Sequence, residues 1–204
     1  MHQGCSRVTT RVVSRLVMSF ATAAIVMVSV APANAASITF SAALAPEAAL
    51  ATGTGAVTVT YDDVDHTLFI DTWFSRLSGT TTVAHIHCCT AVPGTGTVGV
   101  AVTPGTLPSF PVGVSAATYS TTIDLTLGSS YTSSFVTNFG GGPLANAEAA
   151  LIAGMFAGKA YFNVHSTAFP GGEIRGFLAP VPEPGSLLLM GTALAALAAR
   201  RRRT

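Results

Sequence analysis

Residues 57–75 read VTVTYDDVDHTLFIDTWFS, and this stretch decides the fold class. Apolar and polar side chains alternate on both sides of a break at Asp62 and Asp63. Because successive side chains of a β-strand point to opposite faces, this alternation is typical of strands with one buried face. Paired acidic residues between two such runs indicate a turn. The stretch therefore predicts two antiparallel strands joined in a hairpin.

The same period-two alternation recurs along the chain. Candidate strands follow at residues 83–88, 97–102, 122–127, 160–165 and 173–178, and a Pro-Gly-Gly turn separates the last two. Many short strands joined by Gly- and Pro-rich turns are typical of sandwiches and barrels. We therefore expect an all-β fold, a Greek-key or immunoglobulin-like β-sandwich, formed by a single domain.

One or two short helices are expected to interrupt the strands. Residues 143–157 contain good helix formers and end before Gly158, a residue type that commonly terminates helices. Residues 130–139 form a second, shorter helical candidate before three consecutive glycines. Residues 91–113 are rich in Pro and Gly, which predicts a long surface loop around one short strand.

Charge is distributed unevenly along the chain. Only 9% of the 204 residues are charged, and seven of the ten basic ones lie at the two ends. Residues 36–180 hold three basic and eight acidic side chains, so this body is net negative. Because neutralising phosphates requires a basic surface, we expect no nucleic-acid partner. The sequence also lacks a dinucleotide fingerprint, a phosphate loop, a GxSxG elbow and an HExxH motif.

The N-terminal segment has the features of a secretory signal peptide. Three arginines precede an apolar run at residues 16–30, and Ala33-Asn34-Ala35 supplies the small-x-small pattern of a cleavage site. The run is short for a ~30 Å hydrocarbon core, although an uncleaved anchor is the alternative. We therefore expect signal peptidase to cut between Ala35 and Ala36, which makes residues 1–35 the signal peptide.

The C-terminal segment begins with Pro182, Glu183 and Pro184, and its two prolines predict an extended linker. An apolar run from Leu187 to Ala199 follows and would form a helix of ~20 Å, marginal for a full membrane span. Four arginines end the run and favour the cytoplasmic side. We therefore expect this short helix to contact the membrane as a transmembrane segment.

This order of Pro-Glu-Pro, apolar helix and arginine cluster resembles the PEP-CTERM sorting signal of Gram-negative bacteria. The resemblance implies transient anchoring in the inner membrane and cleavage by an exosortase-type protease. It also implies release to the cell surface or the extracellular matrix. The chain is accordingly divided into the signal peptide, a body at residues 36–180 and a sorting signal at residues 181–204.

His85 and His87 flank one isoleucine, and on a strand their side chains would share one face. Their β-carbons would lie ~6.6 Å apart, close enough for both imidazoles to bind one metal ion. His165, at the end of a later candidate strand, would supply a third nitrogen. Imidazoles suit zinc and copper, and a thiolate from Cys88 or Cys89 would favour zinc or cuprous copper. The alternative is that the histidines cap a sheet edge and hydrogen-bond to neighbouring loops.

Cys88 and Cys89 are adjacent, and they become the only cysteines once the signal peptide is removed. In an oxidising compartment the sequence leaves four alternatives open: a disulfide between the two neighbours, two free thiols, metal ligation or an intermolecular bridge. A disulfide between adjacent residues falls outside the usual Cα spacing, yet no third cysteine offers another partner.

A second group of polar residues surrounds the predicted hairpin at residues 160–178. Antiparallel pairing would place His165 near Glu173 and Asn163 near Arg175. We predict that a polar cluster joins the His-x-His strand to this hairpin near one end of the sandwich, formed by His85, His87, His165, Glu173 and Arg175. A structural network is the favoured interpretation. A general acid–base pair is the alternative, although no nucleophile or second carboxylate accompanies it.

Ala84-His85-Ile86-His87, residues 158–165 (GKAYFNVH) and residues 170–176 (PGGEIRG) together resemble the CHRD domain. This module occurs in chordin and in many microbial secreted proteins, and the resemblance covers most of residues 38–178. It implies an all-β sandwich with no established catalytic activity. The usual family form continues the His-Ile-His motif with Gly-Pro, where this chain has two cysteines, so the following loop is expected to differ.

These features favour an exported, non-enzymatic CHRD-type module that needs no cofactor and binds an unknown extracellular ligand or assists matrix assembly. The alternative is a copper- or zinc-binding protein or oxidoreductase, because a His-x-His strand in a β-sandwich also resembles copper/zinc superoxide dismutase. That family needs further histidines, one of them bridging two metals, whereas no histidine lies between His87 and His165.

Overall fold

The computed structural model describes residues 37–182, together with Met1 and Arg201. The predicted signal peptide with its cleavage site at Ala35 and Ala36 lies outside the described residues, as do Glu183, Pro184 and the apolar run from Leu187 to Ala199. Among the residues that are described, no helix is long and apolar enough to cross a membrane.

The described body is built almost entirely from strands. It contains nine strands, two short α-helices and one 3₁₀ turn. The strands are β1 (Ile38–Pro46), β2 (Thr54–Asp62), β3 (Thr67–Ser75), β4 (Thr81–His87), β5 (Val100–Val102), β6 (Ala117–Asp124), β7 (Tyr161–Ser166), β8 (Ile174–Phe177) and β9 (Ala179–Pro180). The helical elements are η1 (Gly128–Ser130), α1 (Ser133–Asn138) and α2 (Leu144–Phe156). The predicted all-β fold with one or two short helices is confirmed.

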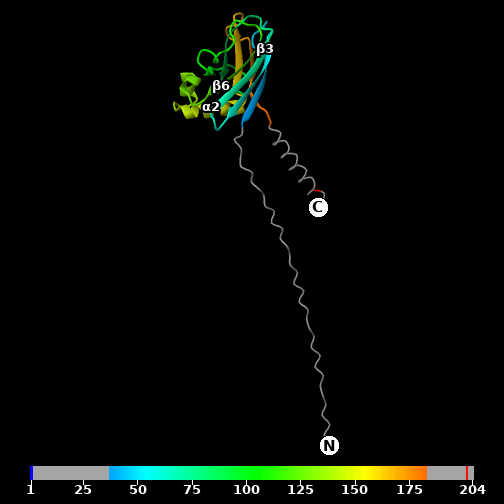
Figure 1. The fold of residues 1–204 in the computed structure, drawn as a ribbon, viewed down its shortest axis with the longest axis vertical. Coiled ribbons are helices and arrows are strands. Elements are labelled where there is room, and N and C mark those ends of the chain that lie inside the picture. The colour runs from blue at the N-terminus through cyan, green and yellow to red at the C-terminus, as the bar shows by residue number, and fades with distance from the viewer. Residues whose placement is uncertain (2–36, 183–200, 202–204) are drawn as a thin grey trace. The chain divides into compact units, whose positions relative to one another are not determined.

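The strands form one curled antiparallel sheet in the order β5-β4-β7-β8-β1-β2-β3-β6, with β9 paired to β1. Strand β1 connects the two halves, because it pairs with β2 along most of its length and with β8 through Ala45 and Pro46. Strands β3 and β6 lie side by side at one end of this order (Figure 1). One hydrophobic cluster draws buried side chains from both halves, for example Val59 and Ile70 from one and Ile86 and Phe162 from the other. The two halves therefore enclose a common core.

The stretch at residues 57–75 folds as the predicted hairpin. Val59 lies opposite Ile70 in the β2–β3 register, and both side chains are fully buried. Phe69 and Trp73 alternate with the buried residues and stay exposed on the outer face. At the turn, a carboxylate oxygen of Asp62 accepts hydrogen bonds from the backbone N–H groups of residues 64 and 65. The Asp62 side chain thus stabilises the turn between the two strands.

Several element boundaries differ from those expected. The candidate strand at residues 97–102 shortens to β5, since Gly96 and Gly99 occupy the loop before it. The helix expected at residues 130–139 begins only at Ser133, because the Thr132 side chain accepts a hydrogen bond from the Phe135 backbone N–H and caps the helix there. Strand β1 was not predicted, because alanines weaken its apolar alternation.

Candidate metal centre

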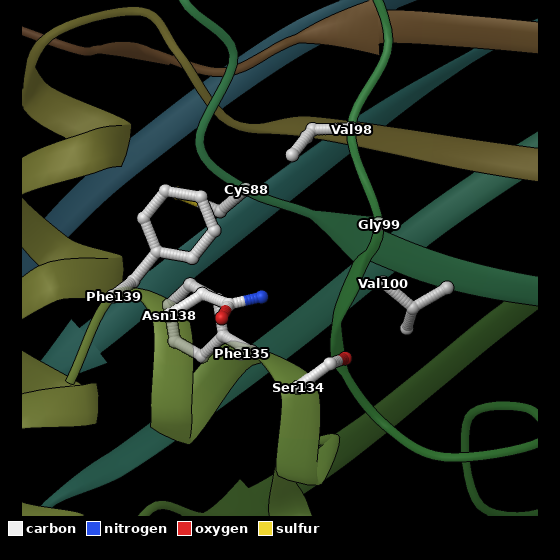
Figure 2. A pocket seen from close by; sticks show the side chains of 8 residues that line it. All are labelled: Cys88, Val98, Gly99, Val100, Ser134, Phe135, Asn138 and Phe139. Atoms are coloured by element: carbon white, nitrogen blue, oxygen red, sulfur yellow. The ribbon is translucent and has the colours of Figure 1, made fainter. Parts of the chain in front are cut away.

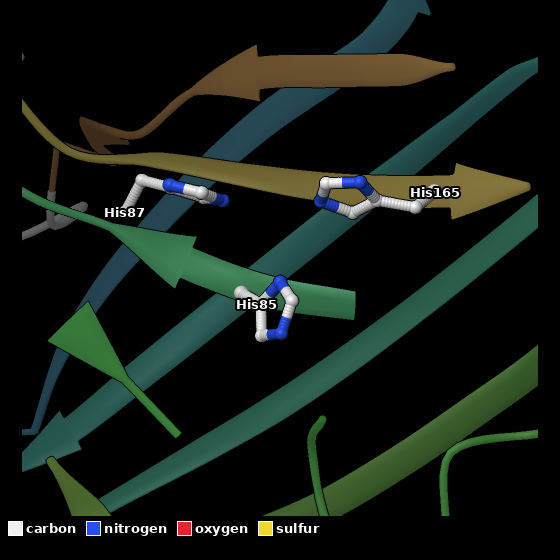
Figure 3. Close-up of side chains that lie close together, drawn as sticks. All are labelled: His85, His87 and His165. Atoms are coloured by element: carbon white, nitrogen blue, oxygen red, sulfur yellow. The ribbon is translucent and has the colours of Figure 1, made fainter. Parts of the chain in front are cut away.

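Strands β4 and β7 bring three histidines together on the outer side of the sheet. In the antiparallel register His85 lies opposite Asn163, His87 opposite Tyr161, and His165 opposite Val83. Ile86, between the two histidines of β4, is fully buried in the core. Because strand side chains alternate, His85 and His87 point away from the core, and Figure 3 shows their rings beside that of His165.

The three imidazoles form a compact group, here named the trihistidine site. One ring nitrogen from each of His85, His87 and His165 lies within 4.8 Å of the others. The ring centre of His85 lies 5.7 Å from that of His87 and 5.4 Å from that of His165. His85 and His87 are 7% and 9% exposed, so the site is largely shielded from bulk water.

A backbone carbonyl orients each of the three rings. His85 Nε2 lies 2.8 Å from the Gly105 oxygen, and His87 Nδ1 lies 2.8 Å from the Val98 oxygen. His165 Nδ1 lies 2.7 Å from the Pro170 oxygen. A carbonyl oxygen can only accept a hydrogen bond, so each of these nitrogens carries the ring proton. In the neutral imidazole the other nitrogen is then an unprotonated acceptor.

The remaining three nitrogens are His85 Nδ1, His87 Nε2 and His165 Nε2. All three are buried and have no hydrogen-bond partner within the described part of the chain. Burial lowers the pKa of His85 below its ordinary value, and it lowers the pKa of His87 to about 4. Both rings are therefore neutral at pH 7, and their lone pairs are available to a ligand.

Three converging lone pairs are better matched by a cation than by a hydrogen-bond donor. A water molecule has two protons and cannot donate to three acceptors. Imidazole nitrogen suits zinc and copper, and metal-bound histidines typically donate their second N–H to a carbonyl or carboxylate, as these three rings do. Metal–nitrogen bonds of ~2.1 Å require nitrogens within ~3.6 Å of one another, so metal binding would need the rings to approach by at most about 1 Å.

Glu173 and Arg175 make different contacts from those expected. The Glu173 carboxylate is fully buried and accepts hydrogen bonds from the backbone N–H groups of Ser78 and Gly79, the latter at 3.5 Å. His165 bonds to the Pro170 carbonyl rather than to Glu173, and Glu173 holds the segment after β3. The polar cluster keeps its three histidines but not this carboxylate.

Arg175 finds its carboxylate partner just after the end of β1. Its Nη1 lies 3.2 Å from Glu47 Oε1, and it donates to the Gly96 carbonyl at 3.0 Å. The guanidinium also lies over the ring of Tyr161, 5.1 Å from its centre, and Tyr161 in turn stacks on His87 at 4.6 Å. Arg175 thus supports the trihistidine site through Tyr161 rather than through Glu173.

Two residues of the surroundings were missed by the sequence reasoning. Tyr161 shares a strand face with His165, so the alternation at residues 160–165 was a signal that could have found it. Glu47 follows β1 and accepts a hydrogen bond from the Asn163 amide as well as pairing with Arg175. No local pattern marks Glu47, since its partners lie more than a hundred residues further along the chain.

Cys88 and Cys89 are joined by a disulfide in the structure. The sulfurs are therefore not thiolate ligands in this form, and they lie against Gly154 of α2. A cavity of about 280 Å³ adjoins Cys88 (Figure 2). Phe135 and Phe139 of the α1 region line it, and none of the site histidines does. The disulfide belongs to the packing of the helices rather than to the trihistidine site.

Comparison with protein families gives two matches. The model of the CHRD domain matches residues 40–178. The model of the PEP-CTERM protein-sorting motif matches residues 180–203. None of the curated proteins and none of the solved structures compared with the chain matches it. The first match spans more than half of the chain and contains all three histidines of the site.

Proposed function

The chain belongs to the CHRD domain family and carries a PEP-CTERM sorting motif, and from this premise we propose that its exported body binds one zinc or copper ion at the trihistidine site. The sorting motif implies export through the membrane to the envelope of a Gram-negative bacterium and processing by exosortase-type machinery. The metal would therefore be taken up outside the cytoplasm.

One observation carries this proposal. His85 Nδ1, His87 Nε2 and His165 Nε2 are buried without a hydrogen-bond partner in the described part of the chain, and a carbonyl fixes the other nitrogen of each clustered ring. If one of these three nitrogens carried a proton instead, it would donate a hydrogen bond to a neighbouring ring nitrogen, and the group would need no metal to pair those two atoms. The lowered pKa values of His85 and His87 oppose this arrangement for two of the three rings.

Binding would join parts of the chain that are distant in sequence. The metal would link β4 to β7, and through the carbonyl contacts it would also hold the loop segments around Val98 and Gly105. A ligand that binds the folded state alone stabilises it. We propose that this makes the body a rigid, non-enzymatic binding module at the cell surface or in the extracellular matrix, where its ligand is unknown.

The test is metal analysis of the exported protein. Zinc and copper(II) titrations followed by calorimetry and elemental analysis should give one ion per chain. His87→Ala should weaken binding at least tenfold, because one of three ligands is lost. His66→Ala is the matched control, since this exposed histidine lies outside the site, and it should bind as the unaltered protein does. Equal affinity for all three proteins would overturn the proposal.

A superoxide-turnover assay on the metal-loaded protein addresses the oxidoreductase alternative. Bound copper that cycles between its two oxidation states and turns over superoxide would replace the non-enzymatic role with an enzymatic one. Bound zinc without turnover would support the binding module.

A further inference from the structure

The metal ligands supplied by the described chain number three, and the neighbouring polar groups are engaged elsewhere. The candidate group contains only histidines. The Glu47 carboxylate contacts Arg175 and Asn163, and the Glu173 carboxylate holds backbone N–H groups. The two cysteine sulfurs are joined to each other and pack against α2. Zinc with three protein ligands commonly completes its tetrahedron with water.

Asn163 offers a second unusual acceptor on the same face of the sheet. It lies opposite His85 in the register and two residues before His165, so its side chain shares their face. Asn163 is 1% exposed, and its amide nitrogen donates to the Glu47 carboxylate. That contact identifies which end of the amide is the oxygen. The oxygen is buried and has no hydrogen-bond partner among the described residues.

An amide oxygen needs a proton donor, and the ring N–H groups of the three histidines are already bonded to backbone carbonyls. A water molecule bound to a metal there has its protons free, because its lone pair faces the metal. It would donate one of them to Asn163. The amide oxygen itself is a less favourable ligand, since carbonyl oxygen suits magnesium, calcium and manganese better than zinc or copper.

We propose that the fourth coordination position of the metal holds an exchangeable water or small anion, an inference that rests on the proposed metal site. Asn163 would accept a hydrogen bond from the water. The three facing nitrogens are all buried, so the position admits only a ligand of a few atoms. The site is then an open metal centre with a second binding function, the capture of a small inorganic anion.

Azide binding to the cobalt(II)-loaded exported protein tests this inference. Cobalt(II) reports its coordination through visible absorption bands, and azide that replaces water should shift these bands saturably. Bound azide has no proton to donate to Asn163, whereas bound water has. Removing the Asn163 acceptor therefore weakens water binding only, and azide competes better for the position. Asn163→Ala should therefore bind azide about two- to tenfold more tightly, the equivalent of one hydrogen bond.

Glu47→Ala is the matched control for this variant. It also removes the Asn163–Glu47 hydrogen bond, but it keeps the amide oxygen, so its azide affinity should equal that of the unaltered protein. Equal azide affinity for Asn163→Ala and the unaltered protein would overturn the role of Asn163. Bound cobalt whose spectrum ignores azide would overturn the open position and leave the metal site standing. If cobalt, zinc and copper all fail to bind, the proposed function is overturned, and this inference with it.

Discussion

Gly154 of α2 lies directly against the sulfur of Cys88, so closely that a β-carbon at Gly154 would collide with it and with the sulfur of Cys89. Gly154 is buried and sits in the last turns of the helix. Glycine is unfavourable within helices by about 1 kcal/mol relative to alanine. The close approach of α2 to the disulfide explains the glycine, because only a residue without a side chain lets the helix pack on the two sulfurs.

Gly154→Ala should therefore destabilise the protein despite the better helix propensity of alanine. We expect a loss of about 1–3 kcal/mol in the free energy of unfolding, the usual cost of overpacking. Urea unfolding would measure it. Gly128→Ala is the control, because a β-carbon there meets no atom within 4 Å. Unchanged stability of Gly154→Ala would contradict the close packing.

The cost of Gly154→Ala should depend on the two cysteines. In a Cys88→Ala, Cys89→Ala background both sulfurs are absent, and the added methyl group gains room. We expect the two changes to be non-additive by about 0.5–3 kcal/mol, as is usual for residues in contact. A double-mutant cycle on unfolding free energies gives this value, and strict additivity would show that the methyl group is resisted by other atoms.

Metal removal should lower the thermal stability of the exported protein. At a free metal concentration a hundredfold above the dissociation constant, the gain is about 2.7 kcal/mol. Adding a chelator should return the melting temperature to that of the metal-free protein. His87→Ala should show a clearly smaller zinc-dependent shift, because its affinity is at least tenfold weaker, whereas His66→Ala should keep the full shift. A full zinc-dependent shift in His87→Ala would place the binding elsewhere.

Glu173 should be important for stability rather than for metal binding. Its fully buried carboxylate accepts hydrogen bonds from Ser78 and Gly79, so Glu173→Ala would leave two backbone N–H groups without this partner. We expect a loss of about 2–3 kcal/mol in unfolding free energy. Glu173→Gln retains an accepting oxygen and should lose less. Both variants should bind zinc normally, and a loss of zinc affinity without destabilisation would return Glu173 to the site.

The pair formed by His66 and Glu148 should make stability depend on pH. The hydrogen bond to the Glu148 carboxylate, 2.9 Å from His66 Nδ1, raises the pKa of His66, and Asp63 and Asp124 add to the effect. A raised pKa in the folded state means that the protonated ring stabilises the fold. This contribution is complete below the unfolded value of about 6.5 and is lost as pH rises through the folded pKa.

Glu148→Gln removes the main cause of that shift. NMR titration should show the pKa of His66 returning towards about 6.5, with a smaller decrease for the control Asp63→Asn. The stability difference between the unaltered protein and Glu148→Gln should shrink as pH increases. An unchanged His66 pKa in Glu148→Gln would contradict the assignment.

The sequence alone determined the hairpin of β2 and β3 and the shared face of two histidines. The alternation at residues 57–75 depends only on the two-residue period of an extended chain, and it predicted the hairpin and its buried face, to which the structure adds the register. The same period placed His85 and His87 on the side away from Ile86. These are local properties, since each follows from the order of neighbouring residues.

Tertiary structure decided the partners and the protonation of the site. Arg175 pairs with Glu47 instead of Glu173 because β1 crosses between the halves of the sheet and delivers Glu47 beside β8. The carbonyls of Val98 and Gly105 fix which nitrogen of each β4 histidine carries the proton. An irregular loop has no period from which its carbonyl directions could be predicted. The atoms behind the three rings are the carbonyl oxygens of the loop residues Val98, Gly105 and Pro170, and only the folded chain aims them at the histidines.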